Sequence, residues 1–327
     1  MVDKPVRPIA VSCGEPAGIG PEIIAKAWQE LRGKIPFFMI GSAEHLPPSI
    51  PSHVIDKPSD AVHSMTKGIP VLPVDFPGVQ NHGKPNPSHA AGVVAAIAKG
   101  AELAVSGDAS ALCTAPIHKK SLQDNAGFAF PGHTEFLASL ANVDRVVMML
   151  ASDMLRVVPV TIHIPVSEVQ EALTAQILEE TLHITLDGLK RDFGFAEPRL
   201  AVAGLNPHAG EGGRMGREEI MLISPVIEKL RTEGADISGP HSADTMFHAS
   251  ARARYDAAIC MYHDQALIPI KTLDFDRGVN VTLGLPFVRT SPDHGTALDI
   301  AGRDKANPSS MIEALRLAAK MAKARAR

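Results

Sequence analysis

Three histidines each follow an apolar run of the kind that forms a buried strand. His163 ends the run RVVPVTIH, His208 comes shortly after RLAVAGLN, and His263 directly follows AAICMY. In an open α/β sheet, ligands bind outside the carboxyl ends of the strands, so these imidazoles could converge on one ion. Three protein ligands with an open position are typical of a catalytic Zn²⁺ or a similar divalent ion. Because the spacing forms no local motif, the alternative is that each histidine ends a strand and bonds a backbone carbonyl.

The segments after two of these strands carry further signals. Residues 204–213 are dense in glycine, which permits a close approach of the backbone to a ligand. Asp264 directly follows His263 and could act as a general base or orient a ligand histidine. The alternative for Asp264 is that it caps the next helix.

Two other segments are suited to an anion. In GHTE (residues 132–135), Thr134 is predicted to cap a helix whose free amides favour negative charge, and His133 adds a possible charged donor. Lys271, Asn280 and Arg289 lie close together in a glycine-rich stretch. Lysine and arginine together suit a phosphate monoester, and the alternative is ordinary surface charge.

Short apolar runs alternate with helical patterns along the chain, which predicts an α/β fold with a largely parallel sheet. The predicted strands are 8–13, 37–40, 111–115, 146–151, 157–163, 199–205, 257–262 and 278–282. The predicted helices are 21–32, 89–106, 135–141, 167–193, 217–233 and 307 to the end. The proline-rich region 47–87 is predicted to be irregular, with one strand around Val71. Five histidines of the first third are expected on exposed loops: His45, His53, His63, His82 and His89.

Composition excludes several classes of protein. The 327 residues suggest about two domains, and the net charge of −4 gives no basic field for nucleic acid. The chain has no apolar run long enough for a membrane span, and its first residues do not resemble a signal peptide. Three cysteines in apolar stretches indicate buried thiols in a reducing cytoplasm.

Six segments, in order along nearly the whole chain, carry a family resemblance. They are GEPAGIGPE (14–22), TAPIHK (114–119), GHTE (132–135), GLNPHAGE (204–211), YHDQ (262–265) and TSPDHGTA (290–297). With these segments the chain resembles the 4-hydroxythreonine-4-phosphate dehydrogenase family of pyridoxal 5′-phosphate biosynthesis. The segment HGTALDIAG (294–302), with Asn307-Pro308 after it, is similar to the adenosine-binding loop of β-decarboxylating dehydrogenases.

This resemblance implies an isocitrate/isopropylmalate dehydrogenase-like fold with two αβα subdomains around a cleft. The first subdomain would combine 1–132 with 265–327, and the second would span 133–264. The implied site residues fall into three groups. The metal ligands are His163, His208 and His263, the substrate contacts are His133, Thr134, Lys271, Asn280 and Arg289, and the cofactor contacts are His294, Gly295, Thr296 and Asn307.

The implied reaction is metal-dependent oxidation of 4-phosphooxy-L-threonine by NAD or NADP, followed by decarboxylation. Asp244 and Asp264 are the candidate bases, and either could instead orient a ligand histidine. The implied partners are one Zn, Mg or Co ion per site and a second subunit that shares the site. The alternatives are oxidation of erythronate or threonate 4-phosphate, or a metal-dependent phosphate hydrolase or acyl transferase on the same fold.

Overall fold

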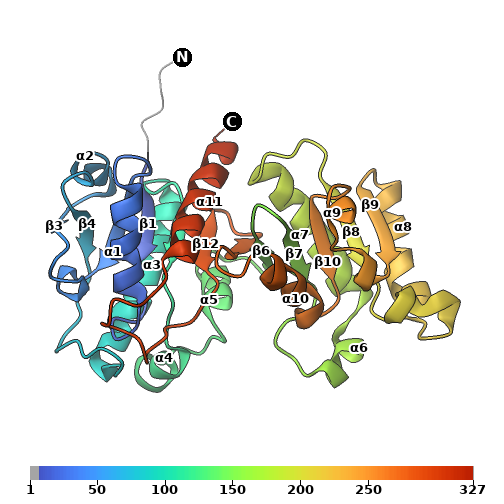
Figure 1. Ribbon diagram of the computed structural model, residues 1–327, viewed down its shortest axis with the longest axis horizontal. Coiled ribbons are helices and arrows are strands. Elements are labelled where there is room, and N and C mark those ends of the chain that lie inside the picture. Colours follow the sequence, from blue (N-terminus) through green and yellow to red (C-terminus); the bar gives the residue numbers. More distant parts are fainter. Residues whose placement is uncertain (1–6, 327) are drawn as a thin grey trace, which may run out of the picture. The chain divides into compact units, whose positions relative to one another are not determined.

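The computed structural model, which describes residues 7–326, divides the chain into two compact units (Figure 1). Unit 1 consists of Met1–Val146 with Leu285–Arg327, and unit 2 of Val147–Gly284. Both are built from alternating strands and helices, as the α/β prediction requires. Unit 2 begins and ends later in the chain than the predicted 133–264. Helix α5 (His133–Leu140) packs on α3 of unit 1, and β11 pairs with β6 of unit 2.

In unit 1, the strands lie in the order β3-β4-β2-β1-β5-β12, and every pair is parallel. The strands are β1 (Ile9–Ser12), β2 (Phe37–Gly41), β3 (Ser52–Val54), β4 (Ile69–Pro73), β5 (Leu112–Thr114) and β12 (Arg289–Pro292). The helices are α1 (Gly20–Leu31), α2 (Ala61–Ser64), α3 (Ala90–Ser106), α4 (Lys119–Ala126), α5 and α11 (Ser309–Arg325). The C-terminal segment completes this unit, because β12 pairs with β5 and α11 packs on β12.

In unit 2, the strands lie in the order β11-β6-β7-β10-β8-β9. Strand β6 is antiparallel to both neighbours, and the remaining pairs are parallel. The strands are β6 (Val147–Ala151), β7 (Arg156–Pro159), β8 (Arg199–Ala203), β9 (Asp236–His241), β10 (Ala257–Cys260) and β11 (Val279–Leu283). The helices are α6 (Val169–Ala172), α7 (Ala175–Arg191), α8 (Ser224–Thr232), α9 (Ala249–Arg252) and α10 (His263–Leu273).

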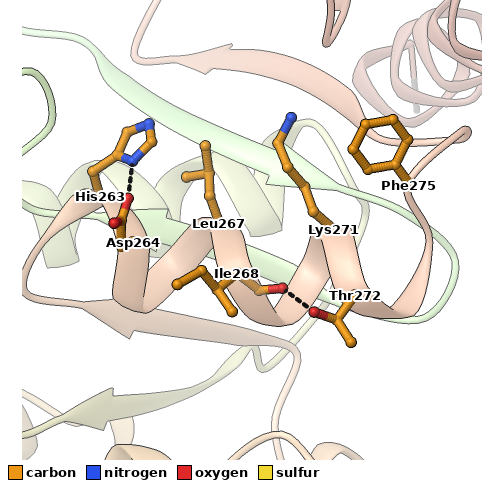
Figure 2. Close-up of a pocket in the computed structure, with 7 residues that line it drawn as sticks. All are labelled: His263, Asp264, Leu267, Ile268, Lys271, Thr272 and Phe275. Carbon is orange, nitrogen blue, oxygen red and sulfur yellow. Dashed lines mark hydrogen bonds and ion pairs between the residues drawn. The ribbon is translucent and has the colours of Figure 1, made fainter.

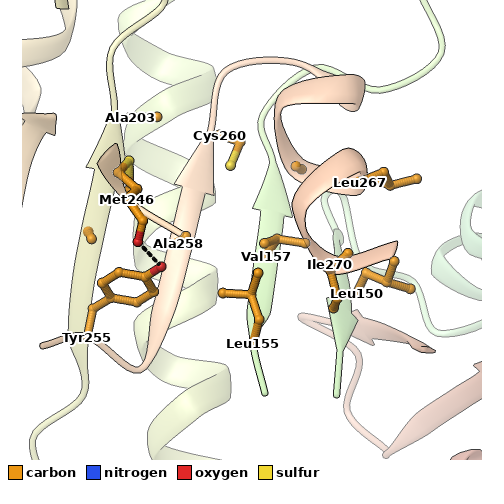
Figure 3. Packing of buried hydrophobic residues seen from close by; sticks show 12 residues of the cluster. Leu150, Leu155, Val157, Ala203, Met246, Tyr255, Ala258, Cys260, Leu267 and Ile270 are labelled. Atoms are coloured by element: carbon orange, nitrogen blue, oxygen red, sulfur yellow. Dashed lines mark hydrogen bonds between the residues drawn. The ribbon is translucent and has the colours of Figure 1, made fainter. Parts of the chain in front are cut away.

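Helix α10 is anchored by its apolar face, which fixes the residues on its other face. Ala266, Leu267 and Ile270 belong to a buried cluster with side chains of β6, β7, β8 and β10 (Figure 3). The spacing of these three positions is that of one face of a helix. Burying them leaves His263 and Lys271 on less buried parts of the same helix.

Two predicted elements are wrong in their bounds, and one capping interpretation is wrong. The helix predicted over 167–193 is two helices, because Thr174 caps α7 by accepting a hydrogen bond from the Ile177 amide (3.2 Å). Strand β7 ends at Pro159, so His163 lies in the loop after it and does not end a strand. His263 is the first residue of α10, whose N-cap is Tyr262, so Asp264 does not cap that helix.

The proline-rich region is more ordered than predicted. It contains β3 as well as β4, the strand expected around Val71. His45 and His89 are buried, which contradicts the expected exposed loops. Each ends a short turn, Ala43–His45 or Pro87–His89, and both rings pack edge-on against Phe76 with centroids 5.0 and 5.7 Å from its ring.

Burial of His45 predicts a loss of stability in mild acid. Burial and the nearby His89 lower the pKa of His45 to about 4. In the unfolded chain a histidine has a pKa of about 6.5, so between these values the unfolded state binds the extra proton. The free energy of unfolding therefore falls as the pH drops from about 6.5 to about 4, by about 3 kcal/mol in total from this residue.

Urea denaturation at pH 7 and pH 4.5 measures this change in the free energy of unfolding. We expect His45→Leu to reduce the loss of stability between the two pH values. The same substitution at the exposed His63 should leave the loss unchanged. If His45→Leu loses as much stability between the two pH values as the unchanged protein, His45 is not the cause of the acid sensitivity.

Candidate functional site

A buried arginine is the central charged group of unit 1. Arg289 begins β12 and is only 2% exposed, and its Nη2 donates to Oγ1 of Thr114 at 2.7 Å. The pairing of β12 with β5 brings these two residues together. Burial lowers the pKa of Arg289 to about 10, against the opposing effects of Cys113 and Glu135, so the guanidinium stays charged at neutral pH. A charge held in the interior is costly unless a partner compensates it.

His133 and Thr134 form the first turn of α5 beside this arginine. The N-cap is Gly132, so Thr134 does not cap the helix as predicted. Nε2 of His133 is covered from solvent and has no hydrogen-bond partner within residues 7–326. Burial, Arg289 and Lys119 together hold the pKa of His133 well below its usual value. The start of α5 therefore offers free amides and a neutral imidazole next to a buried cation.

The segment predicted to bind the cofactor packs on the glycine-rich loop before α1. The Ile19 amide donates to the Thr296 carbonyl at 3.0 Å. A Cβ on Gly18 would lie 2.8 Å from that carbonyl oxygen, so only glycine fits there. The neighbouring Ala17 carbonyl accepts from the Gly83 amide at 2.8 Å. Residues 14–20, 294–302 and the end of the proline-rich region thus meet.

The other predicted cofactor residues lie at the two ends of this segment. His294 is exposed, with Nδ1 3.1 Å from the carbonyl of Gly295, which is also exposed. Asn307 accepts hydrogen bonds from the Ser309 amide (3.0 Å) and hydroxyl (2.7 Å) at the start of α11.

Glu22 fixes this segment and had no predicted role. Its buried carboxylate accepts from the Ala306 amide at 2.9 Å and from Lys26 at 3.0 Å. Lys26 also bonds the Ala306 carbonyl (2.9 Å) and pairs with Asp304 (2.9 Å). The signal in the sequence was the i,i+4 spacing of Glu22 and Lys26, which is more often a surface pair.

Two of the three predicted metal ligands meet in unit 2. The rings of His163 and His263 lie with centroids 5.9 Å apart, and Nδ1 of His263 is 2.7 Å from Oδ1 of Asp264 (Figure 2). Because this contact engages Nδ1, the ring nitrogen of His263 that remains for a ligand is Nε2. Imidazole pairs suit Zn²⁺ or Co²⁺, so the donor set fits part of a metal site. In the part of the chain that the structure describes, no group of three or more His, Cys, Asp or Glu residues could hold a metal.

His208 lies in a different, unusual segment, Pro207–Gly213. The backbone is left-handed at His208 (φ 51°), Ala209 (φ 50°) and Glu211 (φ 44°), a conformation that costs energy for residues other than glycine. Buried Glu219 ties the segment down, because its carboxylate accepts from the Asn206 amide (2.8 Å) and side chain (3.0 Å). Backbone strain of this kind clusters at functional sites. Sequence reasoning missed Glu219, which looks like a surface residue of a helix.

The other predicted residues of unit 2 are Lys271, Asn280 and Asp244, and the short turn Ala243–Thr245 that contains Asp244 contacts the Pro207–Gly213 segment. Lys271 lines a pocket along α10 with His263, and its Nζ lies 5.4 Å from the centre of the Phe275 ring (Figure 2). Asn280, in β11, has a covered Oδ1 that bonds no residue within 7–326. Asp244 is exposed and accepts from the Ser242 hydroxyl at 2.5 Å.

Comparison with known proteins identifies the class of protein. The chain is 62% identical over 317 residues to a 4-hydroxythreonine-4-phosphate dehydrogenase of Ruegeria sp. (strain TM1040), covering 97% of each. It is 58% identical over 316 residues to the protein so named from Roseobacter denitrificans, covering 96% of this chain and 97% of the relative. A crystal structure of 4-hydroxythreonine-4-phosphate dehydrogenase from Klebsiella pneumoniae matches with a TM-score of 0.89 at 38% identity, covering 98% of this chain and 99% of that one. The chain is therefore an α/β dehydrogenase.

The family follows from a second comparison. The model of the family described as "Pyridoxal phosphate biosynthetic protein PdxA" matches residues 35–318, and the chain belongs to this family. The resemblance inferred from the six sequence segments is thereby confirmed. Among the described residues, no helix is both long and apolar enough to span a membrane.

Proposed function

We propose that this dehydrogenase oxidises the secondary alcohol of 4-phosphooxy-L-threonine with NAD⁺ or NADP⁺. The product, 2-amino-3-oxo-4-phosphooxybutanoate, then loses carbon dioxide to give 3-amino-2-oxopropyl phosphate. The names and high identity of the relatives support this substrate. The structural observation that carries the proposal is the buried Arg289 beside the first turn of α5, because this arrangement suits a phosphate group.

The phosphate is proposed to bind the Arg289 guanidinium and the free amides of α5, with His133 and Thr134 as further contacts. Since the pKa of His133 is held low, its ring is neutral at pH 7 and acts as a hydrogen-bonding group rather than a cation. Lys271 and Asn280 are proposed as the substrate contacts contributed by unit 2. The ammonium and the side-chain amide supply donors that suit phosphate or carboxylate oxygens.

One divalent ion, Zn²⁺, Mg²⁺ or Co²⁺, is proposed to bind His163, His208 and His263. When bound, the ion would act as a Lewis acid that lowers the pKa of the substrate hydroxyl. The ring pair of His163 and His263 supports this site, and nitrogen donors favour Zn²⁺ or Co²⁺ over Mg²⁺. Asp264 holds a proton on Nδ1 of His263 and so keeps Nε2 available as a donor.

Two groups remain candidates for the proton acceptor in the oxidation. The hydrogen bond to His263 favours an orienting role for Asp264. Asp244, whose side chain is exposed, is then the candidate base.

The nicotinamide cofactor is proposed to bind at His294, Gly295, Thr296 and Asn307. Packing of this segment on the loop before α1, and its attachment by Glu22, would hold it in a fixed conformation for the cofactor. When bound, the nicotinamide would supply the hydride acceptor for the oxidation, and the base would take the proton of the substrate hydroxyl.

A cytoplasmic homodimer with a shared active site is proposed as the active form. Ile268 and Phe275, next to Lys271, are 61% and 72% exposed, and a second copy could cover them. The three cysteines, Cys13, Cys113 and Cys260, are buried and free, which suits a reducing compartment.

A substrate panel tests the proposed function. The protein is assayed with 4-phosphooxy-L-threonine, erythronate 4-phosphate and threonate 4-phosphate, each with both nicotinamides and with Zn²⁺, Mg²⁺ or Co²⁺. We expect reduced nicotinamide to form fastest from 4-phosphooxy-L-threonine. Faster turnover of another four-carbon phosphate, or phosphate release without nicotinamide reduction, would contradict the proposal.

A further inference from the structure

Lys119 places an ammonium group beside the N-terminus of α5. It is the first residue of α4, whose N-cap His118 accepts a hydrogen bond from the Ser121 amide at 3.3 Å. A Cβ on Gly132 would lie 3.5 Å from both Cε and Nζ of Lys119. Because Gly132 is the N-cap of α5, the ammonium lies next to the free amides of that helix.

Lys119 also affects the ionisation of the His133 imidazole, as the buried Arg289 does. Lys119 and Arg289 both lower the pKa of His133. The covered Nε2 of His133 finds no hydrogen-bond partner in residues 7–326. Two cations therefore act on an imidazole that lies in the first turn of α5, and one of them, Lys119, lies beside the N-cap of that helix.

This arrangement is unfavourable for folding alone. Helix N-termini carry partial positive charge and favour anions, yet Lys119 lies in the first turn of α4 and beside the first turn of α5. The next residue, Lys120, pairs with Asp124 at 2.9 Å, whereas Lys119 has no ion pair with a described residue. Glu135 is the nearby carboxylate, with Oε2 3.6 Å from the same Cβ position on Gly132. A charge kept where it opposes folding indicates a role in binding.

We propose that Lys119 is a substrate-binding residue that contacts the phosphate group from the solvent side, while Arg289 holds it from the interior. The inference rests on the proposed function, because it takes the substrate to be a phosphate monoester. Such a group carries nearly two negative charges at neutral pH, so one cation does not neutralise it. Arg289 supplies a fixed planar donor, and Lys119 supplies a point charge on a flexible chain that can follow the phosphate.

Steady-state kinetics of Lys119→Met, with Lys120→Met as the matched control, test this role. Lys119→Met should raise the KM for 4-phosphooxy-L-threonine about tenfold to a hundredfold, with little change in kcat. Its low activity on unphosphorylated 4-hydroxy-L-threonine should not change. Lys119→Arg should recover most of the lost affinity, because it restores the charge. Equal KM values for Lys119→Met and Lys120→Met, or equal losses on both substrates, would overturn the proposal.

Thermal unfolding distinguishes a role of Lys119 in binding from a role in folding. Removing an unfavourably placed cation should leave the midpoint of Lys119→Met unchanged or raise it. A midpoint well below that of Lys120→Met would show that the side chain serves folding, and would overturn the proposal.

Calorimetric titration with inorganic phosphate tests the role of Lys119 independently of the proposed function. If the unchanged protein oxidises no 4-phosphooxy-L-threonine, the proposed function fails, but phosphate binding still tests Lys119. Weaker phosphate binding by Lys119→Met than by Lys120→Met and the unchanged protein supports the role. Equal or undetectable binding in all three overturns it.

Discussion

An Arg289→Ala variant is expected to have a KM for 4-phosphooxy-L-threonine about a hundredfold higher, or more, than the unchanged protein. The guanidinium is buried and charged, and its hydrogen bonds to a phosphate would be formed away from competing water. Its activity on 4-hydroxy-L-threonine should barely change, because that substrate has no phosphate group for Arg289 to bind. Metal content should also remain unchanged, because the proposed metal ligands lie elsewhere in the chain.

Two further variants make this result interpretable. Arg316→Ala removes an exposed arginine of the same unit, one that pairs with Glu30 and Glu313, and should leave the KM unchanged. Arg289→Lys keeps the charge but loses the planar donor, so its KM should lie between those of Arg316→Ala and Arg289→Ala. If Arg289→Ala damages activity on both substrates equally, the residue serves folding or cofactor binding instead.

The second large effect is expected from the histidine pair of unit 2. His163→Ala and His263→Ala should each lose bound metal and nearly all activity, because each removes an imidazole ligand. His208→Ala should do the same if the third ligand is correctly assigned. Asp264→Ala should weaken metal affinity about tenfold to a hundredfold by removing the bond that orients His263.

Metal analysis of purified protein, together with circular dichroism, measures these outcomes. His183→Ala, on the surface of α7, is the matched control and should keep its metal. Full metal occupancy in a correctly folded His263→Ala variant would show that His263 does not bind the metal, and would contradict the proposed site. Mixed His208→Ala and His263→Ala subunits should regain part of the activity if the dimer shares its sites. No recovery after subunit exchange would count against sharing.

The sequence predicted the α/β class and most strands and helices. It also predicted that three histidines converge, and the structure brings together the rings of two of them, His163 and His263. These features depend on local hydrophobic pattern and on a general property of sheets, so they need no three-dimensional information. Strand β12 was not predicted, because Arg289–Pro292 has no apolar alternation. The closeness of Arg289 to Thr114 was therefore not predicted, since it depends on the pairing of β12 with β5. A common site for Arg289 and His133 was implied only by the family resemblance.

Buried polar residues were the least predictable part of the molecule. Glu22 and Glu219 lie in helical patterns where a carboxylate is usually exposed, and only the loops folded onto them bury them. The same reasoning failed for His45 and His89, which lie in or next to a proline-rich segment but pack around Phe76. In each case burial comes from residues distant in the sequence, which local patterns do not reveal.

The division of unit 1 between the two ends of the chain determines the order in which the protein can be assembled during synthesis. Unit 2 is one continuous stretch, Val147–Gly284, and its sheet can be completed while the ribosome is still translating the C-terminal segment. Unit 1 must wait, because the edge of β5 gains its partner only when β12 has emerged. Arg289 arrives with that strand, so a nascent chain acquires the buried cation that we propose binds phosphate only near the end of translation.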